Sequence, residues 1–145
     1  MSDIEDILSA DDEQEIVEAI RQAEKTTSGE IRIHIEREAP EHSIERAAEV
    51  FHYLKMDNTR ERNGVLIYVA VESRVFVIYG DEGINKVVPV GFWDSTRDVM
   101  LKHFKKGEFK QGIIEGILKS GEQLQKYFPW QHGDENELSD DISRG

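Results

Sequence analysis

The 145-residue chain contains no cysteine, which excludes disulfide bridges, thiolate metal sites and cysteine nucleophiles together. It also lacks any run of about 18 apolar residues that would predict a membrane-spanning helix. Its N-terminus, MSDIEDILSADDEQE, has neither the basic nor the apolar region of a secretory signal peptide. We therefore expect a soluble, cytoplasmic protein without a membrane span, built around one globular core.

A basic surface is missing too. The net charge is -12, and the acidic excess lies at the two ends of the chain. Residues 1–24 hold nine acids and one base, residues 131–145 hold five acids and one base, and residues 25–130 hold sixteen of each. Without a basic face to neutralise phosphates, we expect no nucleic-acid partner. Acidic ends usually act as solvating segments and sometimes attract a basic protein partner, whose identity the sequence does not give.

Familiar catalytic motifs are absent. The sequence has no GxxxxGK[ST] phosphate loop, no GxGxxG after a strand and no GxSxG serine motif. The histidines have no spacing typical of a zinc site. We expect all five at the surface: His34, His42, His52, His103 and His132.

Hydrophobic periodicity predicts four helices and three strands. The helices are expected over residues 11–25, 43–55, 92–105 and 109–127, and the strands over 30–36, 64–71 and 74–79. Residues 30–36 alternate strictly, which predicts a strand with one buried face carrying Ile31, Ile33 and Ile35. The helix between the first two strands is a crossover that makes them parallel, and the short connection before the third strand permits only an antiparallel hairpin.

The predicted fold is therefore a three-layer α/β/α sandwich around a small mixed sheet. The expected organisation is an acidic N-terminal segment (1–10), a domain (11–130) and an acidic C-terminal tail (131–145). We expect a monomer.

The third strand ends beside the start of the second and, if all three strands are neighbours, beside the start of the first, so we expect three loops to converge at one end of this sheet. The oxygen donors that they could present are Ser28, Glu30, Thr59, Asn63, Asp81 and Glu82. Hard oxygen donors suit calcium or magnesium. Two cations of the middle loop, Arg60 and Arg62, could either pair with these acids or receive an anionic group beside a bound metal.

Several motifs together resemble the TPM domain family over about residues 10 to 128. They are TSGEI at residues 27–31, RNGVLI at 62–67, GDEGI at 80–84 and FKKGEFKQGI at 104–113. The resemblance implies an α/β/α sandwich with acidic loop residues gathered at one end. It also implies divalent cation binding, known in some members, and a phosphatase activity proposed for plant relatives.

Two main hypotheses about function follow. The first is a divalent cation site, for calcium or magnesium, formed by Asp81, Glu82, Glu30 and Asn63. The alternative is a metal-dependent phosphatase acting on phosphate monoesters, in which Arg60 or Arg62 binds the anionic group. The second leaves the catalytic residues unknown, because the sequence shows no nucleophile or general acid for it. A protein-interaction module that uses the acidic ends is a third reading.

Overall fold

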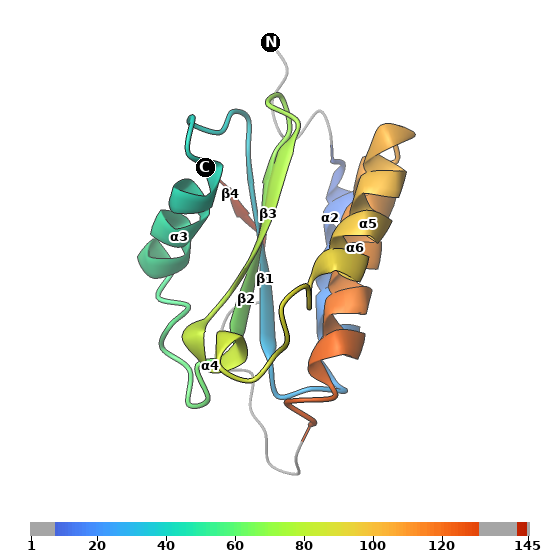
Figure 1. Ribbon diagram of the computed structural model, residues 1–145. Coiled ribbons are helices and arrows are strands. Elements are labelled where there is room, and N and C mark those ends of the chain that lie inside the picture. The colour runs from blue at the N-terminus through green and yellow to red at the C-terminus, as the bar shows by residue number, and fades with distance from the viewer. Residues whose placement is uncertain (1–7, 131–141, 145) are drawn as a thin grey trace.

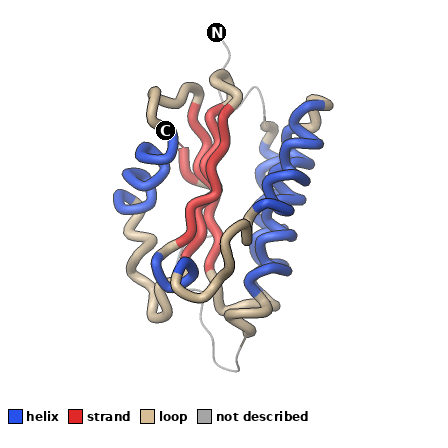
Figure 2. Tube along the Cα trace, in the orientation of Figure 1, coloured by secondary structure: helices blue, strands red, loops and turns tan. Residues whose placement is uncertain are grey.

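A computed structural model describes residues 8–130 and 142–144 as a three-layer sandwich. The elements in chain order are α2 (Ala10–Glu24), β1 (Glu30–Glu36), α3 (Ser43–Tyr53), β2 (Gly64–Ala70), β3 (Val75–Gly80), α4 (Glu82–Asn85), α5 (Asp94–Lys105), α6 (Phe109–Leu124) and β4 (Ser143–Arg144). Figures 1 and 2 show helix α3 on one face of the sheet and helices α2, α5 and α6 on the other. The predicted α/β/α sandwich is confirmed.

The sheet has the order β3-β2-β1-β4. Strands β1 and β2 are parallel, with Glu30 opposite Gly64, and β2 and β3 form the antiparallel hairpin. Both relations agree with the crossover and the hairpin predicted from the sequence. No helix in the described ranges is long and apolar enough to cross a bilayer.

Strand β4 was not predicted. It runs parallel to β1, with Ser143 opposite His34 and Arg144 opposite Ile35. Ile142 packs against the main core, and Arg144 forms an ion pair with Glu13 of helix α2. Residues 142–144 therefore contribute to the sheet and to the core, whereas the rest of the predicted acidic tail, residues 131–141 and 145, lies outside the described residues.

The two faces of the sheet carry cores of different size. Eighteen buried residues, with Ile31, Ile33 and Ile35 among them, form the core between the sheet and helices α2, α5 and α6. Seven buried residues, including Phe51 and Tyr68, form the core beneath α3. The larger core confirms the predicted inward face of β1.

A strand with only one buried face exposes its other face to water. In β1 three side chains of that other face are buried as well. Glu30, His34 and Glu36 are 3%, 4% and 5% exposed. The expectation that His34 lies at the surface is therefore wrong. The cause is that polar partners from α3, β2 and β4 cover the end of this face, so His34 and Glu36 are buried there with hydrogen bonds to Arg46, Tyr68 and Ser143.

Candidate functional site

Three loops meet where strands β1 and β2 begin and β3 ends. The backbone N–H of Glu30 donates to the carbonyl of Asn63 at 3.3 Å, and that of Asp81 donates to the carbonyl of Gly64 at 2.9 Å. These bonds join the start of β1 to the start of β2, and the start of β2 to the end of β3. The convergence expected from the topology is therefore present.

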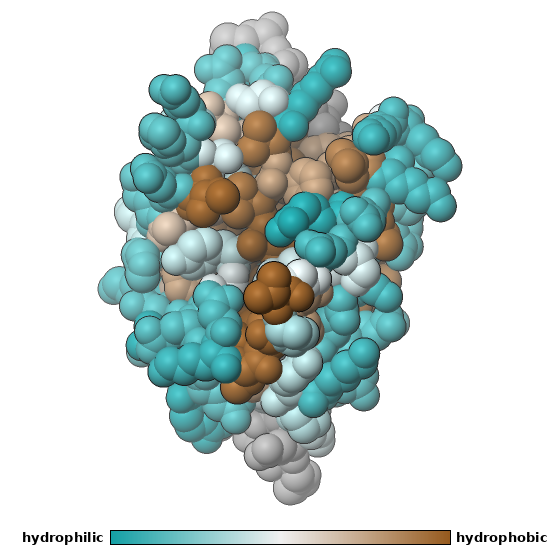
Figure 3. Space-filling view, viewed as in Figure 1, coloured by the Kyte–Doolittle hydropathy of each residue, from teal (hydrophilic) through white to brown (hydrophobic). Residues whose placement is uncertain are grey.

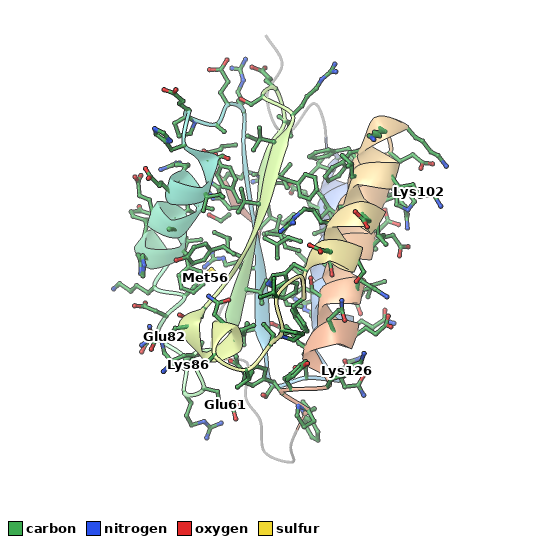
Figure 4. The ribbon with its side chains drawn as sticks, viewed as in Figure 1. Met56, Glu61, Glu82, Lys86, Lys102 and Lys126 are labelled. Atoms are coloured by element: carbon green, nitrogen blue, oxygen red, sulfur yellow. The ribbon has the colours of Figure 1, made fainter. Side chains whose placement is uncertain are left out.

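The loop that follows β3 packs directly on the loop that precedes β2. The backbone N–H of Gly83 donates to the carbonyl of Arg62 at 2.9 Å. A Cβ atom at Gly83 would lie 2.2 Å from the carbonyl oxygen of Glu61, so a larger residue does not fit without moving backbone. Figure 4 shows Glu61, Glu82 and Lys86 at this end of the molecule.

Asp81 holds this junction through both carboxylate oxygens. Its Oδ1 accepts from the backbone N–H of Glu82 at 2.7 Å, which makes Asp81 the N-cap of α4. Its Oδ2 accepts from Nε of Arg62 at 3.1 Å, and Nη1 of Arg62 lies 3.6 Å from Oε1 of Glu82. The hydrogen bond to Asp81 raises the pKa of Arg62 above its usual value. Asp81 is only 5% exposed, so most of this carboxylate is already enclosed by protein.

A second hydrogen-bonded group lies in the same loops. Oε2 of Glu61 accepts from the hydroxyl of Ser28 at 2.6 Å and from Nδ2 of Asn63 at 3.0 Å. Nδ2 of Asn63 also lies 3.2 Å from the Ser28 hydroxyl oxygen, and the backbone N–H of Asn63 donates to the hydroxyl of Thr59 at 3.3 Å. Sequence reasoning missed Glu61, although an acid two residues before Asn63 in the same loop was a usable signal.

The predicted site residues thus fall into two hydrogen-bonded groups. One contains Asp81, Glu82 and Arg62, and the other contains Asn63 with Ser28 and Glu61. The remaining predicted residues, Glu30 and Arg60, belong to the same loops, but Glu30 is almost fully buried and Arg60 is exposed. In the part of the chain that the structure describes, no three acids or histidines stand close enough to hold a metal without rearrangement.

A separate polar cluster lies at the other end of β1, centred on Glu36. Its carboxylate accepts a bidentate pair of hydrogen bonds from Arg46 of α3, at 2.7 and 3.0 Å, and one from the hydroxyl of Tyr68. Nε2 of His34 lies 2.9 Å from Oε1 of Glu36, and Nδ1 lies 2.9 Å from the hydroxyl oxygen of Ser143. The cluster joins β1 to α3, β2 and β4.

Burial and hydrogen bonding act against each other on these groups. Burial alone would raise the pKa of Glu36, but hydrogen bonds from Arg46, Tyr68 and His34 outweigh it and lower the pKa to about 2. Burial lowers the pKa of His34 below its usual value. An ionised Glu36 only accepts hydrogen bonds, so a neutral His34 must carry its proton on Nε2 and accept from Ser143 at Nδ1.

These features define an α/β/α domain with a four-stranded mixed sheet and polar loops gathered at one sheet end. A family model described as the TPM domain matches residues 1–123, and the chain belongs to the TPM domain family. A search among curated proteins gave no match.

Two solved structures have the same fold. The NMR structure of the BA42 protein from the psychrophilic bacterium Bizionia argentinensis is 57% identical to this chain, with a TM-score of 0.93 and complete coverage of both chains. The N-terminal domain of a protein from P. gingivalis is 19% identical, with a TM-score of 0.69 over 87% of this chain and 83% of that one. The second likeness shows the fold alone.

Proposed function

We propose that this TPM domain binds a divalent cation, calcium or magnesium, at the loop end of its sheet. The observation that carries the proposal is the position of Arg62. Its guanidinium lies between the carboxylates of Asp81 and Glu82, at 3.1 and 3.6 Å, so a positive charge already has a place between two acids. Carboxylate and hydroxyl oxygens are the ligands that calcium and magnesium prefer.

Binding at this place requires the arginine to move. The Arg62 side chain is 41% exposed and can leave for solvent, whereas Asp81 is held in position by the α4 backbone. The departing guanidinium would free Oδ2 of Asp81 and Oε1 of Glu82 for a metal ion. Glu61 and Ser28 on the neighbouring loop add oxygen donors to the same end, so the donor chemistry fits a hard cation.

The test is a titration with calcium chloride and magnesium chloride, followed by the amide resonances of residues 28–30, 59–64 and 80–84. Asp81→Asn keeps an N-capping side chain and removes the charge, so it should weaken binding by about tenfold or more with the fold intact. Arg62→Asn should tighten binding, because it removes the competing cation. Asparagine also tolerates the backbone φ of 52° at this position.

Asp94→Asn is the matched control, since Asp94 is an exposed acid on α5. It should leave the affinity unchanged. The proposal is wrong if neither metal shifts the amide resonances of the three loops. It is also wrong if the Asp81 and Asp94 variants lose the same amount of affinity.

The phosphatase alternative has one contact in its favour. The hydroxyl of Ser28 donates to the Glu61 carboxylate at 2.6 Å, which is the arrangement of a nucleophile beside a base. Hydrolysis of p-nitrophenyl phosphate that requires magnesium and disappears in Ser28→Ala would support it. Hydrolysis that survives in Ser28→Ala would assign the activity to a contaminant or to another site.

A further inference from the structure

An apolar groove lies at the opposite end of the sheet from the loop site, between strand β3 and helix α5. It has a volume of about 580 Å³. Its lining includes three aromatic side chains, Phe76, Phe104 and Phe109, and the aliphatic side chains of Val75 and Leu101. Figure 3 shows apolar side chains gathered between β3 and α5 in the upper half of this face. Leu101 is 41% exposed, so apolar surface faces solvent here.

The aromatic residues that line the groove pack against one another and are held in place before any partner binds. The rings of Phe76 and Phe104 meet edge to face at 5.3 Å, and those of Phe104 and Phe109 stack at 5.5 Å. Phe104 is held from behind by α6, since a Cβ atom at Gly112 would lie 2.5 Å from its ring. Binding of a partner in the groove therefore costs little conformational entropy in these side chains, because they are already ordered.

Strand β3 beside the groove has an open edge. In the described ranges β3 pairs only with β2, at the end of the strand order. The backbone N–H of Asp81 donates to the carbonyl of Gly64, so these two residues form a hydrogen-bonded pair. Along an antiparallel ladder, hydrogen-bonded pairs alternate with pairs whose backbone N–H and C=O groups point away from the neighbouring strand. By this alternation, the backbone groups of Phe76 and Ile78 point away from β2. They can therefore accept one further extended strand.

The rim of the groove selects the charge of that strand. Arg74 and Lys105 line it, both are exposed, and no acidic residue is among its described lining residues. Lys102, one turn earlier on α5, points outward near the same end (Figure 4).

We propose that this groove binds an extended acidic segment of a partner protein. The segment adds a strand to β3, inserts an apolar side chain over Phe76 and Phe104, and places a carboxylate at Arg74 and Lys105. The interaction does not involve the cation site, so each proposal can fail without the other.

The probe is a displayed library of random ten-residue peptides, selected on the full chain. Enriched peptides should combine acidic with apolar residues, and one of them, synthesised, is titrated by fluorescence polarisation. Reversing both rim charges, Arg74→Glu with Lys105→Glu, should weaken binding by roughly tenfold or more. Lys126→Glu is the matched control, because Lys126 is a cation just beyond the C-terminal end of α6, far from Lys102 and the groove (Figure 4). It should leave the affinity unchanged.

A second measurement tests strand addition itself. Bound peptide should slow hydrogen exchange at the amides of Phe76 and Ile78, which pure apolar contact would not do. The proposal is overturned if no peptide is enriched, if enriched peptides lack acids, or if the double charge reversal leaves the affinity unchanged. Sedimentation that shows a dimer dissolved by the same reversal would assign the groove to a second copy instead, and would also overturn it.

Discussion

Replacing Glu36 by glutamine tests the electrostatic account of the buried cluster. The variant keeps the shape of the side chain and removes the charge that Arg46 and Tyr68 face. The pKa of Glu36 falls from 4.5 to about 2 on folding, which corresponds to about 3 kcal/mol of stability at pH 7. Loss of one partner of a buried ion pair typically costs roughly 3–5 kcal/mol, so both routes lead to the same expectation.

The assay is urea denaturation followed by circular dichroism between pH 7 and pH 3. A carboxyl group whose pKa is lowered by folding stabilises the protein above pH 4.5, and the contribution is lost as the pH falls toward 2. The difference between wild type and Glu36→Gln should therefore shrink as the pH is lowered. Glu49→Gln is the control, because Glu49 contacts the same Arg46 but is 70% exposed, and should cost less than about 1 kcal/mol. Equal costs for the two variants, or a difference independent of pH, would refute the reasoning.

Gly83→Ala should destabilise the domain by about 1–3 kcal/mol in urea denaturation, because the new methyl group meets the Glu61 carbonyl. Gly80→Ala, where a Cβ finds only ordinary contacts at 3.6 Å, should cost clearly less, and a reversed order would contradict the packing argument. His34 should carry its proton on Nε2 at neutral pH, as read from the ring nitrogen shifts by NMR. A proton on Nδ1 would show that Glu36 is not the acceptor described.

The layers and the pairing of the first three strands were predictable because each rests on a local period. Residues 30–36 alternate, and the order of strand, helix, strand and short hairpin leaves little choice of topology. The hidden side of β1 was not predictable. Alternating polar and apolar residues are expected both when the polar face meets water and when it is buried with hydrogen-bond partners. Here the partners of Glu36 are Arg46 and Tyr68, which come from other elements of the chain.

The candidate site was predictable in place but less so in detail. The hairpin put Asp81 near the start of β2, whereas the choice of Arg62 rather than Arg60 as its partner depends on backbone angles that no motif encodes. Two-residue strand β4 has no period at all, since Ser143 and Arg144 are too short a stretch to carry one. Its position is decided by Ile142 in the core and by the edge of β1.

The unequal cores on the two faces of the sheet imply that the layers open separately. Beneath α3 only seven residues are buried, against eighteen beneath the three-helix layer, so less apolar surface opposes the detachment of α3. The ion pair between Arg46 and Glu36 then holds α3 to the sheet in addition to the small apolar core. Amide exchange in α3 is therefore expected at a lower free energy than in α2 or α6, as a partial unfolding that leaves the rest of the domain in place.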